Sequence, residues 1–370
     1  MKVLITGANG FIGRNLRTRL AEDGSFEVDQ FTRSDSLENL FQKVRNADRI
    51  VHLAGVNRPE NMEAFDEVNR GLTSALCDFM ASGNLDTPVI YTSSIQAGSD
   101  NPYSASKLAA EKSLIALSDE CSTPVSLFRL PNVFGKWCRP DYNSVVATFC
   151  HRIAHGKPVD IHDPDKVINL VYIDDVISKF IEVLKSPHEG CEFVGVEPVY
   201  NITLVELADM LARYHDSRNN LITEDVGSGL QRALYATYLS YLEPDNFSYG
   251  LTAHKDERGA FVEFLKTRNS GQVSYFTARP GVTRGGHYHH TKNEKFLIVQ
   301  GEALFKFRHV ETGDYHQLKV CADTPQVVET VPGWVHDITN TGSGDLVVLL
   351  WANEIFDDAS PDTIGASLDG

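Results

Sequence analysis

The stretch MKVLITGANGFIG, residues 1 to 13, decides the fold of the chain. Its apolar run at residues 3–5 is typical of a strand that is buried on both faces. Gly7, Gly10 and Gly13 then allow a tight turn, a close approach of backbone N–H groups to a phosphate, and close packing of the next helix. That helix begins near Phe11, and its positive N-terminal end would face a pyrophosphate. The stretch therefore predicts a doubly wound parallel α/β sheet that binds a dinucleotide.

Composition narrows the class of protein. The chain has 370 residues and a net charge of −16, with 34 Lys and Arg against 50 Asp and Glu. This balance argues against nucleic acid and against insertion into, or binding to, an anionic membrane. The six cysteines form no CxxC pair, which is typical of reduced thiols. Because we also find neither a signal peptide nor an apolar run of transmembrane length, we expect a cytoplasmic protein.

The ends of the next two strands indicate which cofactor is bound. The second strand ends at Phe31-Thr32-Arg33, where an NAD site usually has an acidic residue. Arg33 suits a 2′-phosphate instead, which favours NADPH, although a solvated surface arginine is the alternative. A third strand then runs into a turn of small residues that lets a cofactor pass close to the backbone. The expected cofactor contacts of this part of the chain are Gly7, Gly10, Phe11, Ile12, Gly13, Arg33, Leu53, Ala54 and Gly55.

A tyrosine and a lysine follow the fourth strand, which ends at Ser93 and Ser94. Tyr103 and Lys107 have i, i+4 spacing and share one helix face. A phenol titrates near ~10, and a lysine ammonium one turn away is expected to lower that pKa. Lys107 and Tyr103 would also contact the nicotinamide ribose, and a serine hydroxyl would orient a carbonyl. This set is what hydride transfer to a ketone requires, although a plain surface helix is the alternative.

The motifs GANGFIG (7–13), HLAG (52–55), TSS (92–94), YSASK (103–107) and YIDDV (172–176) together resemble extended short-chain dehydrogenase/reductases that act on nucleotide sugars. The resemblance covers roughly residues 1–241. It implies that Ser94 is the active-site hydroxyl, Tyr103 the acid and Lys107 its partner, with Ser93 as a less suitable substitute for Ser94.

A local basic patch follows the segment FRLPNVFG (128–135), which resembles that family's segment between the cofactor and sugar sites. Lys136, Arg139 and Asn143 are our candidates for binding the diphosphate of a UDP-sugar. A solvated loop is the alternative.

The pattern changes to short strands with glycine turns from about residue 261, which predicts a small all-β barrel. We therefore expect a cofactor-binding reductase domain at residues 1–243 and a β domain at residues 244–370. Ahead of the boundary, Thr203 and Glu206 have the spacing of a capping box at a helix start.

Histidines and a glutamate of the β domain have the spacing of metal ligands. His287 and His289 face one side of a strand, Glu294 opens the next strand, and a later strand carries His336. This set suits Zn²⁺ or another divalent transition metal. The spacing also resembles the two cupin motifs, which implies a cupin barrel.

A cupin without metal is the alternative to this reading. Residues 256–261 and 284–288 resemble metal-free cupin epimerases, in which the histidine at the position of His287 would be a base that removes a proton next to a 4-keto group. Lys295 and Arg284 are candidates for stabilising the enolate that would form.

Over its whole length the chain resembles bifunctional enzymes of capsular-polysaccharide biosynthesis that join such a reductase to a cupin. The stretches GVNRPE (55–60), FGKWC (134–138) and NEKF (293–296) contribute to this resemblance. It implies that the cupin epimerises C3 of a UDP-2-acetamido-2,6-dideoxy-4-keto-hexose, that the reductase reduces the C4 ketone with NADPH, and that the protein is a homodimer. Two alternatives remain: a cupin that serves only for oligomerisation or ligand sensing, and a front half that keeps its NAD⁺ unconsumed.

Overall fold

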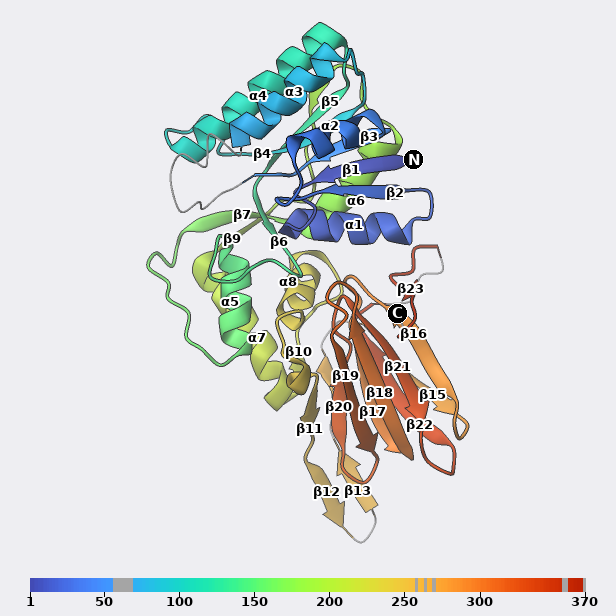
Figure 1. The fold of residues 1–370 in the computed structure, drawn as a ribbon. Coiled ribbons are helices and arrows are strands. Elements are labelled where there is room, and N and C mark those ends of the chain that lie inside the picture. The colour runs from blue at the N-terminus through green and yellow to red at the C-terminus, as the bar shows by residue number, and fades with distance from the viewer. Residues whose placement is uncertain (56–68, 257–258, 263–264, 268–270, 355–358, 369–370) are drawn as a thin grey trace. The chain divides into compact units, whose positions relative to one another are not determined.

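The computed structural model describes residues 1–370 except 56–68, 257–258, 263–264, 268–270, 355–358 and 369–370. The chain forms two compact units (Figure 1). The first unit comprises residues 1–134, 141–144 and 168–202, and the second comprises residues 135–140, 145–167 and 203–370. No helix of the described residues is long and apolar enough to cross a membrane.

A six-stranded parallel sheet forms the centre of the first unit, in the order β2-β1-β3-β4-β5-β8. Its strands are β1 (Lys2–Thr6), β2 (Glu27–Phe31), β3 (Arg49–His52), β4 (Val89–Ser94), β5 (Val125–Leu130) and β8 (Cys191–Phe193). The strand order reverses between β1 and β3, and open α/β sheets bind ligands at the carboxyl ends of the strands at such a point. The predicted doubly wound parallel sheet is therefore confirmed for the front half.

Helices pack on this sheet, and one apolar core lies between it and α2, α3 and α4. Leu4, Ile50 and Leu127 of the sheet are fully buried there, as are Leu76 of α3 and Leu114 of α4. The helices of the unit are α1 (Phe11–Glu22), α2 (Leu37–Arg45), α3 (Leu72–Ser82), α4 (Pro102–Cys121) and α6 (Ile173–Lys185). A smaller sheet joins β6 (Asn132–Phe134), β7 (Val167–Tyr172) and β9 (Tyr200–Thr203).

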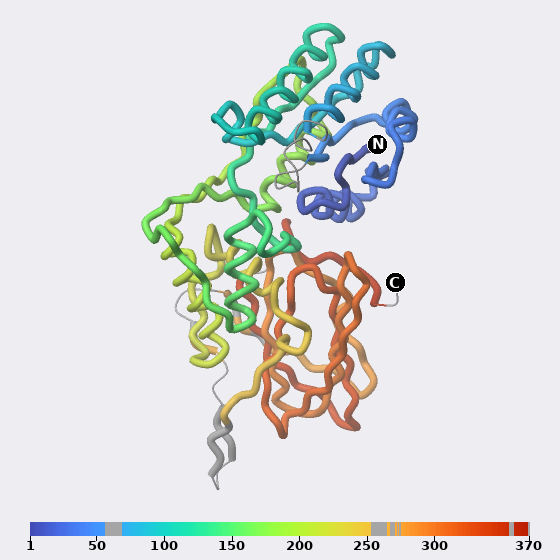
Figure 2. Tube along the Cα trace, turned by 60° about the vertical axis from the view of Figure 1, so that its left-hand side comes forward, coloured from blue at the N-terminus to red at the C-terminus, as the bar shows by residue number. Residues whose placement is uncertain are grey.

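Two five-stranded antiparallel sheets form most of the second unit, and Figure 2 shows them face to face. The first contains β11 (Ser248–Gly250), β20 (Gln326–Glu329), β17 (Glu294–Gln300), β22 (Leu346–Ala352) and β15 (Gln272–Ala278). The second contains β19 (Tyr315–Cys321), β18 (Glu302–His309), β21 (Trp334–Asn340), β16 (Thr283–Tyr288) and β23 (Ile364–Gly365). Phe296 of the first sheet and Phe305 of the second pack together, with ring centroids 5.6 Å apart. The prediction of an all-β region is confirmed, whereas the cupin barrel stays a prediction.

The second unit also contains helices that precede the predicted domain boundary at residues 243 and 244. They are α5 (Val145–Ala154), α7 (Leu204–Asn220) and α8 (Gly229–Leu239). The remaining short elements of the unit are β10 (Ile222–Thr223), between α7 and α8, and then η2 (Pro244–Asn246), β12 (Ala253–Asp256), β13 (Gly259–Val262) and β14 (Lys266–Thr267). The capping box at Thr203 and Glu206 is confirmed, because each side chain bonds the other residue's backbone N–H.

A buried polar network joins α7 and α8 to the outer face of the first β sheet. Lys295 of β17 donates to Glu329 of β20 at 2.7 Å, and Arg218 of α7 forms a salt bridge with the same carboxylate. The hydroxyl of Tyr235, on α8, donates to Glu329 at 3.4 Å. Glu329 therefore brings together cations and a phenol from three elements, which explains why these helices belong to the second compact unit.

Candidate functional site

The glycine turn after β1 leaves no room for side chains. Gly7 has a φ of +68°, and a Cβ there would lie 2.8 Å from the backbone nitrogen of Ala54. A Cβ on Gly13 would collide with the Gly7 carbonyl oxygen, and the Gly10 N–H donates to that oxygen at 2.9 Å. Gly10 gives α1 no side-chain cap, so the first N–H groups of the helix can bind an anion. The turn therefore fits a dinucleotide pyrophosphate.

A buried hydrogen-bonded chain links the ends of β1 and β3 to α3, and the sequence reasoning missed it. The Ala54 N–H donates to the Thr6 hydroxyl at 3.1 Å, and that hydroxyl lies 2.7 Å from Nδ1 of His52. Nε2 of His52 lies 2.9 Å from the Thr73 hydroxyl, which donates to the Asn69 carbonyl at 2.7 Å. Burial lowers the pKa of His52 to about 3. A neutral His52 thus holds the backbone beside the glycine turn, and a histidine in an otherwise apolar strand was the available signal.

Ser94, Tyr103 and Lys107 lie at the carboxyl end of β4 and on the first turns of α4. Asn101 caps this helix by accepting from the Ser104 N–H at 2.9 Å. A hydrogen bond joins the side chains of Ser94 and Tyr103. The Ser93 hydroxyl is buried without a hydrogen-bond partner among the described residues. The structure therefore brings Ser94, and not Ser93, to Tyr103.

Lys107 lies close to the small residues of the cofactor side. A Cβ on Gly55 would lie 3.4 Å from Nζ of Lys107 and 2.9 Å from Oδ1 of Asn69. Nδ2 of Asn69 donates at 3.0 Å to the hydroxyl of Ser106, on α4. The structure thus gathers Gly55, Asn69 and Lys107 around one point, and the close approach of a cofactor to Gly55 stays a prediction.

The predicted electrostatic effect of Lys107 on Tyr103 is not what the structure shows. Burial raises the pKa of Tyr103, and the hydrogen bond with Ser94 opposes this increase. Nζ of Lys107 instead donates to the Thr92 carbonyl at 2.9 Å and lies 4.9 Å from the ring centre of Tyr91. Burial also lowers the pKa of Lys107 to about 8, against the opposing charge of Glu111.

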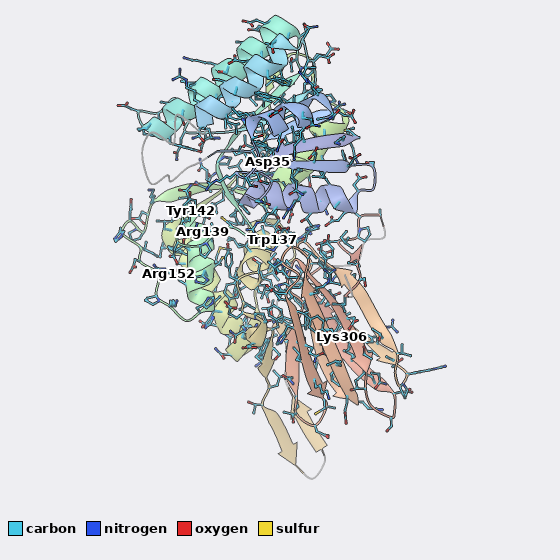
Figure 3. All side chains as sticks on the ribbon, in the orientation of Figure 1. Asp35, Trp137, Arg139, Tyr142, Arg152 and Lys306 are labelled. Atoms are coloured by element: carbon cyan, nitrogen blue, oxygen red, sulfur yellow. The ribbon has the colours of Figure 1, made fainter. Side chains whose placement is uncertain are left out.

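The turn after β2 contains an exposed arginine and a carboxylate that accepts hydrogen bonds within the turn. Arg33 is exposed. Asp35, labelled in Figure 3, accepts from the N–H and the hydroxyl of Thr32 at 2.8 and 2.9 Å and lies 3.6 Å from Nζ of Lys43. The Thr32 N–H and the other contacts hold the pKa of Asp35 below its usual range. Because the Asp35 carboxylate is used inside this turn, Arg33 remains the predicted contact for a ribose phosphate.

One of the three residues of the predicted diphosphate patch is buried. Lys136 is 1% exposed, whereas Arg139 and Asn143 are exposed. Lys136 and Arg139 belong to the second compact unit, and Asn143 belongs to the first. Trp137, labelled with Arg139 in Figure 3, donates its indole N–H to Nε2 of His309 at 2.9 Å. The buried Lys136 thus lies next to a residue that is bonded to a strand of the second β sheet.

The second candidate site is a cluster of side chains in the β region. His287 of β16, His289, Glu294 of β17 and His336 of β21 place one ligand atom each within 4.8 Å of one another. His287 and His336 are paired across neighbouring strands, next to an irregularity in the register at Gly285. Glu294 Oε2 lies 3.2 Å from His289 Nε2 and 3.5 Å from His336 Nε2. The predicted ligand set is therefore brought together.

The donor atoms of this cluster fit a divalent metal. The Nε2 atom of His336 is buried, and no described residue gives it a well-formed hydrogen bond. His289 lies 2.5 Å through Nδ1 from the Asp362 carbonyl, which leaves its Nε2 for a metal. Imidazole nitrogens with one carboxylate are a common set for Zn²⁺ and its neighbours.

Electrostatics in the cluster favour neutral His287 and His336 beside a charged Glu294 carboxylate. Burial lowers the pKa of His287 to about 4, and the nearby His336 and His289 contribute. Burial also lowers the pKa of His336. Burial acts to raise the pKa of Glu294, but His289 and His336 outweigh it and hold the value well below the usual range. Neutral histidines and an ionised glutamate are the forms that bind metals.

The two predicted helpers of enolate stabilisation lie elsewhere. Successive residues of a strand face opposite sides, so Lys295 points away from the face that carries Glu294 and pairs with Glu329. Arg284 is exposed and donates to the Thr277 carbonyl at 3.1 Å, with its guanidinium over the Phe276 ring. The prediction that Lys295 and Arg284 stabilise an enolate at this cluster is therefore wrong.

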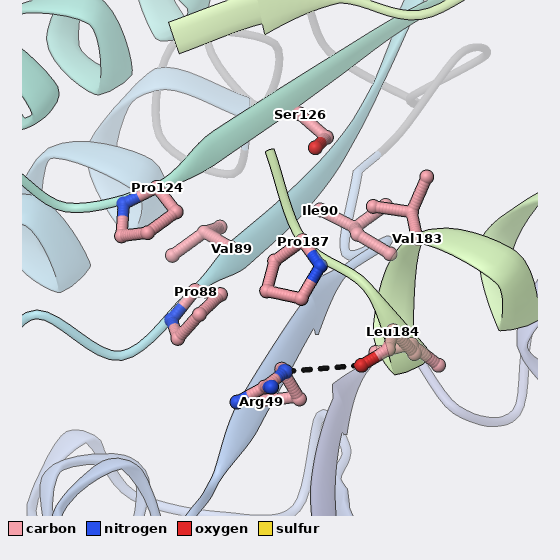
Figure 4. Close-up of a pocket in the computed structure, with 9 residues that line it drawn as sticks. All are labelled: Arg49, Pro88, Val89, Ile90, Pro124, Ser126, Val183, Leu184 and Pro187. Carbon is pink, nitrogen blue, oxygen red and sulfur yellow. Dashed lines mark hydrogen bonds between the residues drawn. The ribbon is translucent and has the colours of Figure 1, made fainter. Parts of the chain in front are cut away.

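A small pocket in the first unit lies at the opposite edge of the parallel sheet from the glycine turn (Figure 4). Its lining includes Arg49, Val89 and Ser126 from the amino ends of β3, β4 and β5. Arg49 donates at 3.1 Å to the Leu184 carbonyl, at the end of α6. This pocket is therefore separate from the candidate site at the carboxyl edge.

Comparison with known proteins identifies relatives of both halves and of the whole chain. The NAD dependent epimerase/dehydratase family matches residues 3–202, and a polysaccharide biosynthesis C-terminal domain matches residues 254–364. The UDP-2-acetamido-2,6-beta-L-arabino-hexul-4-ose reductase of Pseudomonas aeruginosa is 54% identical over 368 residues, which span 100% of this chain and 99% of that protein. The crystal structure of the capsular polysaccharide assembling protein CapF from Staphylococcus aureus has a TM-score of 0.68 and 39% identity, with coverage of 99% and 100%.

A more distant structure, the UDP-glucuronic acid 4-epimerase of Bacillus cereus in complex with NAD, covers 58% of this chain and 83% of its own. Its TM-score is 0.51 at 20% identity, so it supports the fold of the front half alone.

The match over residues 3–202 defines the class of the protein, which belongs to the NAD dependent epimerase/dehydratase family. The full-length matches then narrow the assignment. The chain is a member of the CapF family, in which this front half continues into a polysaccharide biosynthesis C-terminal domain.

Proposed function

We propose that the chain is a bifunctional nucleotide-sugar enzyme of capsule or O-antigen biosynthesis. Its substrate is a UDP-2-acetamido-2,6-dideoxy-4-keto-hexose, whose C3 is epimerised by the β domain, a cupin, and whose C4 ketone is then reduced by the front half. The observation that carries the proposal is the Ser94–Tyr103 hydrogen bond beside Lys107, at the sheet edge that holds the glycine turn. The full-length similarity to a protein named as a UDP-4-keto-sugar reductase supports the same substrate class.

The residues of the front half have distinct roles in ketone reduction. When bound, NADPH supplies the hydride that forms the new C–H bond at C4. The glycine turn binds the pyrophosphate of the cofactor, and Arg33 binds the 2′-phosphate. The Ser94 hydroxyl donates to the ketone oxygen, and Tyr103 gives its proton to that oxygen as the C=O double bond becomes a C–O single bond. Because its pKa is raised, Tyr103 is protonated at neutral pH and is refilled from solvent.

The histidine cluster is our proposed site of C3 epimerisation. When bound to His289, Glu294, His336 and His287, a divalent metal supplies positive charge that makes the proton at C3 more acidic. A base removes that proton, and a proton returns to the opposite face of C3, so the sugar changes configuration without net oxidation. Burial keeps His287 neutral, the form required of a ligand or of this base. Epimerisation precedes reduction because it needs the ketone that reduction removes.

Proton NMR of the purified protein with the 4-keto UDP-sugar in D₂O, without NADPH, tests this division of labour. Deuterium at C3 is the expected result, and addition of NADPH should then yield the alcohol with one NADPH oxidised per sugar. NADPH oxidation without deuterium at C3 would leave a reductase that carries a structural β domain. Turnover without net NADPH oxidation would instead indicate a front half that retains its cofactor.

Two variants separate the sites. Tyr103→Phe should keep exchange at C3 and lose NADPH oxidation, and loss of both activities would contradict the proposal. His287→Ala should lose exchange at C3. Its zinc content then decides the role of His287, because loss of the metal indicates a ligand and retention indicates the base.

A further inference from the structure

The C-terminal segment of the chain lies directly beside the strand that carries His287. Strand β23 pairs antiparallel with β16, with Gly365 opposite His287 and Ile364 opposite Tyr288. The pairing extends through the Ala366 N–H, which donates to the Gly286 carbonyl at 2.9 Å. At its far end the Ser367 carbonyl accepts from Arg308 at 2.8 Å. Residues 362–367, which we name the C-terminal clasp, thus contain the two-residue edge strand next to the histidine cluster.

Asp362 begins the clasp and binds the loop between β16 and β17 through both its side chain and its backbone. Its carboxylate accepts three consecutive backbone N–H groups, from His290 at 2.8 Å, Thr291 at 2.6 Å and Lys292 at 2.7 Å. It also accepts the Thr291 hydroxyl at 3.0 Å. The Asp362 carbonyl lies 2.5 Å from Nδ1 of His289. Asp362 therefore holds three consecutive residues of the turn that separates His289 from Glu294, and Asn353 holds the next one by accepting from the Asn293 N–H at 2.9 Å.

This turn depends on Asp362 because it is buried. His290, Thr291 and Lys292 are each less than 10% exposed, so water is a poor substitute for the carboxylate. A buried N–H group that loses its acceptor destabilises the fold, and Asp362→Ala would leave three such groups without their acceptor at once. Movement of the turn would shift His289 and Glu294 relative to one another, since they are its two ends.

We propose that the C-terminal clasp positions the metal ligands and that Asp362 is its positioning residue. The proposal rests on the proposed metal site and adds Asp362, which is not one of the four ligands, as a residue that metal binding requires. Partners in the shell around metal ligands commonly contribute 10–100-fold to metal affinity. Loss of Asp362 should therefore weaken zinc binding by about that factor.

Zinc affinity of the full-length protein, measured by competition with a chromophoric chelator, tests the clasp. Asp362→Ala and a chain ended after residue 361 should bind Zn²⁺ about 10–100-fold more weakly than the wild type. Asp314→Ala is the matched control, because Asp314 accepts from the Thr312 hydroxyl at 2.7 Å in another turn. A chain ended after residue 367 keeps the clasp and should match the wild type. NADPH binding to the first unit should be unchanged in all four proteins.

The absorption spectrum of bound Co²⁺ distinguishes positioning from general stabilisation. Asp362→Asn keeps the size of the side chain and one acceptor oxygen, so it should bind metal with an intermediate affinity and a shifted Co²⁺ spectrum. Wild-type affinity and spectrum in Asp362→Ala, Asp362→Asn and the chain ended after residue 361 would overturn the clasp while leaving the metal site intact. A wild-type protein that binds no zinc at a 1:1 ratio would overturn the proposed metal site and the clasp together.

Discussion

Lys107 sets a measurable limit on the pH range of the proposed reductase. Its ammonium is buried, and its pKa is about 8 instead of the usual 10.5. The charged form then falls to about one half at pH 8 and about one tenth at pH 9. Because we expect the charged form of Lys107 to bind the nicotinamide ribose, kcat/KM for NADPH-dependent ketone reduction should fall about tenfold per pH unit above 8. Tyr103 does not interfere, since burial raises its pKa above the usual value near 10.

Two substitutions on α4 test whether Lys107 causes this fall in kcat/KM above pH 8, which is the alkaline limb of the pH profile. Lys107→Arg keeps a positive charge throughout the range, so its plateau should be lower but its alkaline limb should disappear. Lys112→Arg is the matched control, because Lys112 is exposed on the same helix and its variant should keep the limb. Initial rates of NADPH oxidation between pH 6 and pH 10 provide the measurement. A flat wild-type profile to pH 9.5, or a limb that survives in Lys107→Arg, would refute the reasoning.

Stability should change with pH in the opposite direction to activity. The folded-state pKa of Lys107 lies below the unfolded value, so between about pH 8 and pH 10.4 the unfolded chain holds a proton that the native state has lost. The free energy of unfolding therefore rises with pH in this window. The full difference in pKa corresponds to about 3 kcal/mol. Urea unfolding of the wild type and Lys107→Met at pH 7.5 and pH 10 should show that the wild type gains about 2 kcal/mol of this difference relative to the variant.

Three further predictions concern the second unit. Glu329→Gln should reduce stability by about 3–5 kcal/mol, because it leaves buried cations without their carboxylate, whereas Glu302→Gln at an exposed position should stay within about 0.5 kcal/mol in the same thermal melt. Gly333→Ala should lower the melting temperature followed by tryptophan fluorescence, because Gly333 has a φ of +80° and a Cβ would lie 2.8 Å from the Trp137 ring. Removal of metal with a chelator should lower the melting temperature of the second unit in calorimetry and leave the melting temperature of the first unit unchanged. The second unit should lose about 2.7 kcal/mol of stability if the metal was present at 100 times its Kd. Equal melting with and without chelator would contradict the metal site.

The features that could be predicted from the sequence depend on neighbours in the chain. The glycine turn needs a positive φ at Gly7 and close packing at Gly13, and both requirements follow from the strand–turn–helix order. The capping box at Thr203 and the i, i+4 pair of Tyr103 and Lys107 are also local. The histidine cluster spans a longer stretch, but strand alternation and the position of Glu294 at a strand start were sufficient to predict that its ligands converge.

The features that could not be predicted depend on partners far along the chain. The sequence predicts an exposed Lys136, whereas the structure buries it next to Trp137, which bonds His309, 172 residues further along the chain. The Asp362 carboxylate gains its role from a turn about 70 residues earlier. In both cases a polar side chain is common at the surface, and the burial that changes its role comes from the tertiary fold.

The position of the predicted domain boundary has a physical explanation in the same terms. Hydrophobic periodicity changes where strands replace helices, so it indicates a boundary after α8. The compact units instead depend on which side chains are buried together. Lys295 and Glu329 face away from the core between the two β sheets, and both are buried. Burying an ionised pair is costly unless further partners satisfy it, and Arg218 of α7 and Tyr235 of α8 are those partners. The β sheets therefore use helices that the sequence pattern assigns to the front half, because Arg218 and Tyr235 on those helices bond the buried Glu329 carboxylate.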